Sequence, residues 1–311
     1  MSECEFHDWL TRRLRQRPGE RVLVGAGPDD CAHLDVSGLA NLAVSTDTIV
    51  ESTHFLPDDD ALAVGWKAVA ASVSDLAASG CRPLWGLVAL TLRRGMGDRW
   101  AMRLMEGIIA CAQRYNLAIV GGDTTSVYGP TSVNITVIGT PFGEKAISRS
   151  GAQVNDVLVV TGFLGGSLAG RHMRPEPRFA EIRKILEIVP VHACMDISDG
   201  LTLDLHRLLS ASNVGAEIDE AEIPISPVAK KMAETSGKTP LEHALGDGED
   251  FELLFSVSAE DWKKLYYEWA TSGIKTRLSK IGRVVAEQGM RLVAPDGSLH
   301  TAAPAGYEHE F

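Results

Sequence analysis

Aspartates flanked by small residues recur along this chain, each beside an apolar segment. They stand in "GPDDCAHL" (27–34), "VSTDT" (44–48), "SVSDLAASG" (72–80), "GGDTTS" (121–126) and "MDISDGL" (195–201). Functional side chains commonly gather where strands and helices end, and Ser, Thr and Gly leave room there for an ion or a phosphate. Carboxylates that converge raise each other's pKa values and destabilise a fold unless cations neutralise them. Carboxylate and hydroxyl oxygens without thiolates favour Mg²⁺ over Zn²⁺.

Taken singly, each motif also fits a structural role. Asp75 fits a polar residue on the wet face of a helix, and "GGDTTS" fits a loop. "SDGL" fits a helix start that Ser198 or Asp199 caps. The adjacent Asp29 and Asp30 fit a solvated turn, since turns select Gly, Pro and Asp. The functional interpretation gains its weight from the presence of all the motifs in one chain and in one order.

The composition limits the class of protein and its partners. With 311 residues, 45% apolar and 23% charged, the chain is expected to be globular and long enough for two domains. No apolar run approaches the roughly 20 residues that cross a bilayer, and the N-terminus lacks the apolar core of a signal peptide. No membrane partner is therefore expected. A formal net charge of -11 disfavours nucleic acid as a partner.

The cysteines predict the compartment. Their number is odd, at 5, and no pair forms C-x-x-C. This pattern argues against a disulfide framework and against a thiolate zinc site. A cytoplasmic location is expected.

Strand-like and helical segments alternate, which predicts a mixed α/β or α+β fold in two halves. Helices are expected at 1–17, 61–80, 98–115, 198–212 and 258–273, the last with Ser258 as its N-cap. Strands are expected at 41–50, 83–92, 117–120, 132–140, 155–162, 215–219 and 251–257. The turn-rich segment 141–156 is the expected boundary between domains at 1–145 and 146–311. "TGFLGGSLAG" (161–170) fits a tight strand-to-helix connection, with a phosphate-binding role left open.

The motifs carry a family resemblance. In order they read "GPDDCAHL", "VSTDTIVESTHF", "ASVSDLAASGCRP", "GGDTTS", "SRSGA", "MDISDGLTLDL" and "GDGEDFELLF". This series resembles the thiamine-monophosphate kinase family, from about residue 5 to the terminal "GYEHEF". That family belongs to the superfamily that also holds aminoimidazole ribonucleotide synthetase and selenophosphate synthetase.

The resemblance implies a fold and an activity. The fold would have an N-terminal α/β domain whose strands form a barrel across a homodimer interface, and a C-terminal α/β domain that closes over the nucleotide. The activity would be direct transfer of the γ-phosphoryl of ATP to thiamine monophosphate, the last step of thiamine diphosphate biosynthesis. Anions must approach anions in such a transfer, so positioning and charge neutralisation dominate the catalysis. Several Mg²⁺ ions are implied, and a monovalent cation is a further candidate.

The resemblance also implies roles for individual residues. Magnesium ligands are implied at Asp30, Ser45, Thr46, Asp47, Asp75, Asp123, Asp196 and Asp199. ATP contacts are implied at Gly122, Asp123, Arg149 and Ser198, and thiamine monophosphate contacts at His54, Glu249 and Tyr307. The residues expected to be catalytic are Asp47, Asp75, Asp123 and Arg149, the last as a phosphate clamp. By themselves, His54 fits a buried or capping histidine, Glu249 a surface carboxylate and Tyr307 an anchor for the C-terminal tail.

Two motifs depart from the family pattern. Pro28 stands where the family usually has Gly, which stiffens the turn before the aspartate pair and removes an N–H. "GDGEDFELL" has Asp247 and Phe251 in place of a Gly and a Tyr. Asp247 is expected to add negative charge close to Glu249 and to affect substrate specificity.

Three other functions remain open. The first is another ATP-using enzyme of the superfamily, although Cys4 has no lysine close by as the selenophosphate branch requires. The second is a non-catalytic regulator that binds nucleotide and metal, which has little use for so many aspartates. The third is a metal-dependent phosphatase, but no H-x-H or H-D motif lies near the aspartates.

Overall fold

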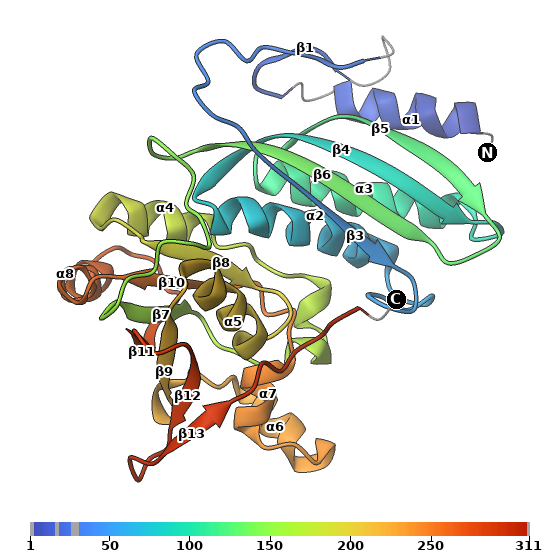
Figure 1. The fold of residues 1–311 in the computed structure, drawn as a ribbon. Helices are drawn as coiled ribbons and strands as arrows, with labels where there is room; N and C mark the ends of the chain where they lie inside the picture. Colours follow the sequence, from blue (N-terminus) through green and yellow to red (C-terminus); the bar gives the residue numbers. More distant parts are fainter. Residues whose placement is uncertain (1–2, 16–18, 26–30, 310–311) are drawn as a thin grey trace. The chain divides into compact units, whose positions relative to one another are not determined.

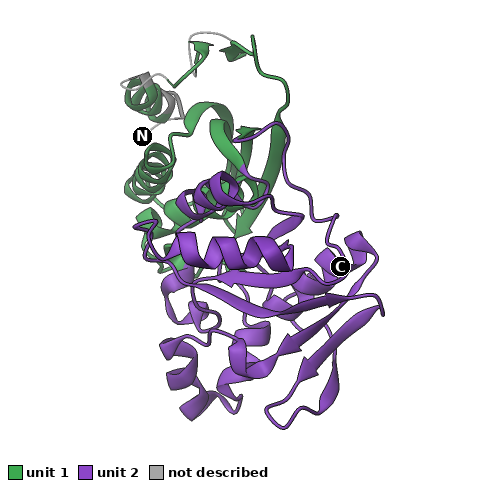
Figure 2. Ribbon diagram, turned by 90° about the vertical axis from the view of Figure 1, so that its left-hand side faces the viewer, with its two compact units in different colours: residues 1–76, 81–141, 173–175 green, residues 77–80, 142–172, 176–311 purple. Residues whose placement is uncertain are grey.

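The computed structural model describes residues 3–15, 19–25 and 31–309 (Figure 1). Pro28, Asp29 and Asp30 therefore lie outside the described residues. The chain forms two compact units (Figure 2). Unit 1 comprises residues 1–76, 81–141 and 173–175, and unit 2 comprises residues 77–80, 142–172 and 176–311. The short segments 77–80 and 173–175 each belong to a different unit from the residues on either side of them. Nothing in the local sequence predicted this division.

Unit 1 is a four-stranded sheet covered by helices. Its helices are α1 (Glu3–Arg15), α2 (Ala61–Ala78, whose end enters unit 2) and α3 (Asp98–Arg114). Its strands are β1 (Val22–Val24), β2 (His33–Leu34), β3 (Ala43–Val50), β4 (Cys81–Arg93), β5 (Ala118–Val127) and β6 (Ser132–Pro141). The sheet order is β3-β6-β4-β5, with β4 and β5 parallel and the other pairs antiparallel. β1 and β2 form a separate hairpin-like pair.

The two faces of this sheet differ in burial. Figure 1 shows α2 and α3 along one face, which we call the covered face. Val88 and Ile135 point to the covered face and are buried, whereas Leu87 and Ala89 on the other side are exposed. Side chains alternate along a strand, so one sheet can have a packed face and an open face. We call the second one the open face.

The helices α2 and α3 begin where the sequence predicts and end within two residues of the predicted ends. α2 stops before Gly80, which has a left-handed backbone (φ 63°) and donates its N–H to the carbonyl of Ala77 at 2.9 Å. α3 begins at Asp98, after Gly97. α2 is long and apolar enough to span a membrane, but 83% of that stretch is buried within the structure, as in the core helix of a folded domain.

Unit 2 is built on a seven-stranded sheet with the order β13-β12-β9-β11-β7-β10-β8. Its strands are β7 (Val157–Thr161), β8 (Ala193–Ile197), β9 (Gly215–Asp219), β10 (Glu252–Val257), β11 (Leu278–Val285), β12 (Gly289–Val293) and β13 (Leu299–Ala302). Its helices are α4 (Phe179–Ile188), α5 (Leu201–Ser212), α6 (Pro227–Ser236), α7 (Pro240–Gly246) and α8 (Ala259–Trp269), with 3₁₀ turns η1 (Ser167–Ala169), η2 (Arg171–Met173) and η3 (Glu220–Glu222). Among the described strands of this sheet, β9 and β12 pair in parallel and the other neighbours pair antiparallel.

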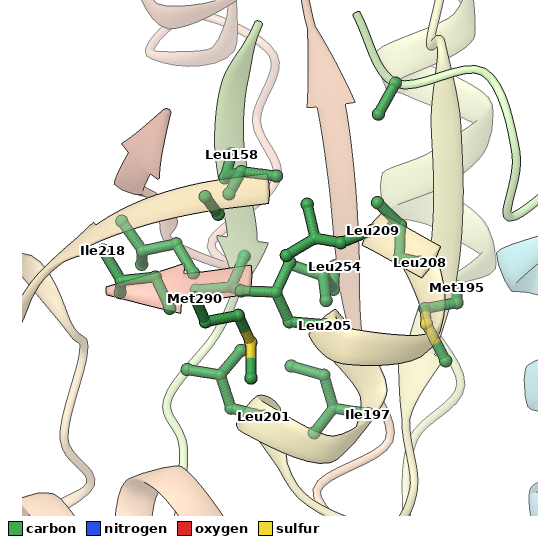
Figure 3. Close-up of a cluster of buried hydrophobic side chains, with 14 of the residues drawn as sticks. Leu158, Met195, Ile197, Leu201, Leu205, Leu208, Leu209, Ile218, Leu254 and Met290 are labelled. Atoms are coloured by element: carbon green, nitrogen blue, oxygen red, sulfur yellow. The ribbon is translucent and has the colours of Figure 1, made fainter. Parts of the chain in front are cut away.

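Helices cover both faces of this sheet. Leu158 of β7 packs in the core beneath α5, where Figure 3 shows Leu205 and Leu209 pointing toward the strands. Val159, the next residue, lies in the second core with Ile182 of α4. Burial on both faces explains why β7 is a continuous apolar run without alternation.

No disulfide joins the cysteines that the structure describes. Cys31 is exposed, whereas Cys81, Cys111 and Cys194 are buried. Burial raises the pKa of the Cys81 thiol to about 11, which keeps it protonated and unreactive.

Candidate functional site

Three metal-ligand candidates of unit 1 share the covered face of the sheet. Residues 45, 47 and 49 point the same way along β3, and Ile49 is buried beneath the helices. The Ser45 hydroxyl donates a hydrogen bond to the Asp75 carboxylate, which α2 brings to this face. Asp47 stands two residues further along the same strand. Ser45, Asp47 and Asp75 thus form an oxygen-only set of the kind that Mg²⁺ prefers.

Two other candidates point to the open face. Asp123 of β5 pairs with Ala89 of β4, which points to the open face. Asp47 of β3 pairs with Ile135 of β6, which points to the covered face. Thr46 also lies on the open face, where its hydroxyl is 2.9 Å from that of Thr136. Within unit 1, the structure therefore does not bring Thr46 and Asp123 to the Asp47 side of the sheet.

"GGDTTS" lies inside a strand. We expected a strand at 117–120 with Asp123 in the loop after it, but β5 continues to Val127. Parallel pairing with β4 extends the strand, and the β-branched Thr124 and Thr125 suit it. Gly122 is required here because a Cβ would collide with the carbonyl oxygen of Val88.

A cavity of about 460 Å³ borders this strand on the side of α1 and the start of α3. Its polar lining includes Asp98, Thr124 and Ser126, and its apolar lining includes Phe6 and Met96. Concave surfaces with a mixed lining of this size are typical of sites for small molecules.

His54 is held in a tight turn after β3. Its Nδ1 accepts a hydrogen bond from the Val50 N–H at 3.1 Å, and its carbonyl accepts one from the Lys67 ammonium at 2.6 Å. Ser52 takes a left-handed backbone (φ 70°) to close the turn. Because Nδ1 is an acceptor, the proton of the neutral ring resides on Nε2. This tautomer presents Nε2–H as a donor, which suits an anionic ligand group.

In unit 2, backbone hydrogen bonds join three segments that are distant in the sequence. The Glu249 N–H donates to the Ser198 carbonyl at 2.6 Å, and the Tyr307 N–H donates to the Asp199 carbonyl at 3.0 Å. The Phe251 N–H donates to the Ile197 carbonyl at 2.8 Å. The "DISDGL" loop, the "GDGEDF" loop and the C-terminal tail thus meet at one place. Ser198, Asp199, Glu249 and Tyr307 come together there.

Asp196 and Asp199 have different surroundings. Asp196 is buried at the end of β8, where it pairs with Leu253. Asp199 is half-buried, and its Oδ2 accepts a hydrogen bond from the Arg207 guanidinium at 2.5 Å. A cation at Asp199 would share this carboxylate with Arg207.

Asp204 caps the loop that carries Ser198 and Asp199. We expected Ser198 or Asp199 to cap α5, but the N-cap residue is Gly200, which makes no side-chain capping bond. One oxygen of Asp204 instead accepts the N–H groups of residues 198, 199 and 200, at 3.0, 2.9 and 3.2 Å. Burial raises the pKa of Asp204 to about 6, against these hydrogen bonds and the nearby Arg207, which favour the charged form.

The "GDGEDF" loop is strained and firmly anchored. Glu249 and Phe251 both have left-handed backbones, with φ of 53° and 51°. The buried Asp250 accepts hydrogen bonds from the Gly165 N–H at 2.8 Å and from Arg171 Nη2 at 2.7 Å. Glu252, also buried, pairs with Arg178 at 2.5 Å. These buried partners hold the loop in a conformation that the chain would not adopt alone.

Asp247 belongs to a cluster of its own. Its carboxylate contacts His243 Nδ1 at 2.8 Å and accepts the Gly166 N–H at 3.1 Å. Lys238 Nζ lies 3.6 Å away. The extra negative charge that we expected near Glu249 is therefore matched by neighbours that contact Asp247 itself.

Arg149 presents its guanidinium to solvent. The backbone around it is fixed, because the Ser212 hydroxyl accepts the Gly151 and Ala152 N–H groups at 3.2 Å and donates to the Arg149 carbonyl at 3.3 Å. Among the residues that the structure describes, no carboxylate pairs with this guanidinium. An exposed cation on a fixed loop suits the binding of a phosphate.

The candidates do not form one metal cage within either unit. In the described part of the chain, no three His, Cys, Asp or Glu side chains are placed as a metal site. The predicted ligands are divided between two faces of one sheet and a second unit, and Asp30 is outside the described residues. Their assignment to metal remains a prediction.

Sequence reasoning missed His172, Arg171, Arg178 and Asp204, which surround the assembled loops. Asp204 carried a signal, since an aspartate in the first turn of a helix can accept the N–H groups at its start. The other three carried none, because the carboxylates that they contact in the segment 249–252 are 74 or more residues away in the sequence.

Comparison with known proteins identifies the family of this chain. Residues 28–141 match the family model for the N-terminal domain of AIR synthase related proteins, and residues 146–295 match the model for its C-terminal domain. A thiamine-monophosphate kinase from Rhodopirellula baltica is 40% identical to this chain, over 99% of this chain and 97% of the relative.

Solved structures agree in the fold. The crystal structure of a thiamine-monophosphate kinase from Stenotrophomonas maltophilia K279a is 31% identical, with a TM-score of 0.81 over 94% of this chain and 96% of its own. A structure described as AaThiL complexed with AMPPCP and TMP is 28% identical, with a TM-score of 0.77 over 100% of this chain and 99% of its own. This chain belongs to the thiamine-monophosphate kinase family, within the AIR synthase related proteins.

Proposed function

We propose that this protein phosphorylates thiamine monophosphate with ATP and so forms thiamine diphosphate and ADP. The observation that carries the proposal is the meeting of Ser198, Asp199, Glu249 and Tyr307 through backbone hydrogen bonds between three distant segments. Each of the three segments carries a motif of the family. The relative that is 40% identical over 97% of its own length is named a thiamine-monophosphate kinase.

The chain's residues divide into two binding sets. Gly122, Arg149 and Ser198 contact ATP, with the exposed Arg149 guanidinium as a clamp on its phosphates. His54, Glu249 and Tyr307 contact thiamine monophosphate. Nε2–H of His54 suits the phosphate, the Glu249 carboxylate suits the cationic thiazolium or the aminopyrimidine, and the exposed ring of Tyr307 can stack on a thiamine ring.

The transfer needs no covalent step on a side chain. A phosphate oxygen of thiamine monophosphate forms a bond to the γ-phosphorus of ATP, the bond from that phosphorus to the β–γ bridging oxygen breaks, and ADP leaves with the electron pair. Positioned binding groups supply most of the catalysis in such a reaction. We assign Arg149 to the phosphates of ATP and His54 to the phosphate of thiamine monophosphate.

We assign the magnesium sites to Ser45, Asp47 and Asp75, with Asp30, Thr46, Asp123, Asp196 and Asp199 as further ligands. The oxygen-only donors and the Ser45–Asp75 hydrogen bond fit a hard cation. Mg²⁺ bound at these residues would neutralise the negative charge of the ATP and thiamine monophosphate phosphates. A monovalent cation is a further candidate on the same chemical grounds.

We also propose that the protein is a cytoplasmic homodimer that pairs through the open face of unit 1. Val44 is 64% exposed there and Leu87 is 39% exposed. An open sheet face with apolar side chains favours burial against a second copy, and self-complementary pairing is the commonest oligomeric symmetry.

The function is tested by incubating the purified protein with Mg²⁺ and ATP, and with either thiamine monophosphate or thiamine. We expect thiamine diphosphate and ADP in equal amounts from the monophosphate, and no product from thiamine. Thiamine diphosphate from thiamine would indicate a pyrophosphokinase. Binding of ATP without turnover of any acceptor would favour the regulator, and phosphate release from the monophosphate would favour the phosphatase.

A further inference from the structure

His172 contacts the carboxylate to which we assign substrate binding. Its Nδ1 lies 2.8 Å from Glu249 Oε2, and both side chains are largely buried, at 18% and 21% exposed. His172 comes from the 3₁₀ turn η2, 77 positions before Glu249 in the sequence, as the two residue numbers show. No motif in the sequence pointed to this histidine.

The neighbour of His172 holds the other side of the same loop. Arg171 Nη2 donates to Asp250 Oδ1 at 2.7 Å, and Arg171 Nη1 lies 3.4 Å from Glu252 Oε1. The dipeptide Arg171–His172 thus contacts three acidic residues of the segment 249–252. The turn that presents His172 is fixed by the partners of Arg171.

Glu249 depends on such contacts for its position. Its backbone is left-handed (φ 53°), a conformation that costs free energy for a residue other than glycine and persists only where the surroundings enforce it. The preceding Gly248 is also left-handed (φ 72°), and a Cβ there would press against the Ser198 carbonyl at 2.9 Å. The backbone conformation fixes the position of the Glu249 Cα atom, and the contact with His172 fixes the position of its carboxylate.

We propose that His172 is a positioning residue for the substrate. By donating Nδ1–H to Oε2 of Glu249, it directs Oε1 to the cationic thiazolium or the aminopyrimidine of the substrate. The inference rests on the proposed function, because it deepens the role of Glu249. An imidazole suits this task because its Nδ1–H orients the Glu249 carboxylate from a short, partly buried side chain. A lysine or arginine at this position would bring a permanent positive charge to the carboxylate.

The proposal is tested with His172→Ala and His172→Asn. The amide nitrogen of asparagine and Nδ1 of histidine are both bonded to Cγ, so asparagine can donate to Glu249 from the same place. We expect His172→Ala to raise KM for thiamine monophosphate by about tenfold, as for loss of one hydrogen bond to a charged group, with KM for ATP and kcat changed less than twofold. His172→Asn should restore most of the loss.

His192→Ala is the matched control. His192 Nδ1 lies 2.8 Å from Asp156 Oδ2, so it has the same type of carboxylate contact at the same distance, but no residue of the proposed substrate set. The His192→Ala variant should have the same KM for thiamine monophosphate as the wild type. Equal increases in His172→Ala and His192→Ala, or a failure of His172→Asn to restore KM, would show that His172 only stabilises the fold.

Direct binding separates this inference from the proposed function. Calorimetric titration with thiamine monophosphate, without ATP, should give a weaker affinity for His172→Ala than for the wild type. If the wild type binds but does not turn over, and His172→Ala weakens binding, the positioning role stands and the kinase function fails. If the wild type turns over and His172→Ala binds equally well, the function stands and the positioning role is wrong.

Discussion

The carboxylates of this protein have similar sequence contexts but different surroundings. Asp47 and Asp75 lie with the Ser45 hydroxyl on one face of a sheet, where all three side chains are partly exposed. Asp204 is buried and saturated with N–H donors. The first arrangement suits a site that gains a cation, whereas the second suits a residue that fixes a loop. Burial and hydrogen-bond partners, more than residue type, therefore distinguish an aspartate that can bind a metal ion from one that stabilises a loop.

At the residue scale, Asp47→Asn tests the assignment of a metal ligand. The variant keeps the shape and removes the charge, so we expect turnover to fall at least about a hundredfold while the free energy of unfolding changes by less than about 1 kcal/mol. Asp58→Asn, an exposed carboxylate in the turn before α2, is the control and should keep the native rate. A near-native rate for Asp47→Asn would remove this residue from the set of ligands.

The raised pKa of Asp204 predicts a pH dependence of stability. A pKa raised from the ordinary 3.8 to about 6 favours the protonated form in the folded state, so this contribution to stability is complete below pH 3.8 and is lost as pH rises through about 6. The change amounts to about 3 kcal/mol, at about 1.4 kcal/mol per pKa unit. Relative to Asp204→Asn, the wild type should lose stability between pH 4 and 6 and remain level above pH 7.

The measurement is urea denaturation of both proteins at several pH values. Subtracting the two curves cancels the titrating groups that do not interact with Asp204, so the difference reports Asp204 and its coupling to Asp199. A difference that is flat with pH, or that changes in favour of the wild type as pH rises, would mean that its hydrogen bonds and Arg207 outweigh burial.

At the scale of elements, α2 and α3 cross at a pair of glycines. A Cβ on Gly65 would collide with the carbonyl oxygen of Leu104, and a Cβ on Gly107 with that of Leu62. The contact is reciprocal, so each helix has a glycine where the backbone of the other passes. Close passage matters for function because α2 brings Asp75 to the face of β3 that carries Ser45.

We expect Gly107→Ala to destabilise the protein by about 1–3 kcal/mol, because the added methyl forces the helices apart. It should also reduce turnover, since a shift of α2 moves Asp75 away from Ser45. Gly143→Ala is the control, because no atom lies within 4 Å of the added methyl and its backbone is not left-handed. Urea denaturation measures the change in stability, and the rate of thiamine diphosphate formation measures the change in turnover. Unchanged stability in Gly107→Ala would show that the helices can adjust at no cost.

At the scale of the whole molecule, the open face of unit 1 sets the proposed assembly. Val44→Arg places a charge on that face, and burying an unpaired charge is costly. We expect this variant to remain folded and to dissociate into single chains, as measured by size exclusion with light scattering. Leu299→Arg, at a residue of unit 2 that is 51% exposed, is the control and should keep the native mass. A native mass for Val44→Arg would exclude this face as the interface.

Much of the local structure could be predicted from the sequence. Ser258 caps α8 by accepting the Asp261 N–H at 3.0 Å, β9 spans residues 215–219 as expected, and α2 ends before Gly80. Caps, glycine stops and apolar periodicity act over a few residues, so a short window of sequence contains them. The length of β5 was underestimated because its pairing with β4 lies outside any such window.

The sequence by itself determined the motifs, their order and the family to which they belong, because side-chain chemistry and local propensity can be read residue by residue. Only the tertiary structure decided that Asp47 and Asp123 point to opposite faces of one sheet, since strand register sets which way a side chain points. Only the tertiary structure placed His172 against Glu249, and Tyr307 against the "DISDGL" loop. These contacts join residues that are far apart in the sequence, and they form only when the whole chain has folded.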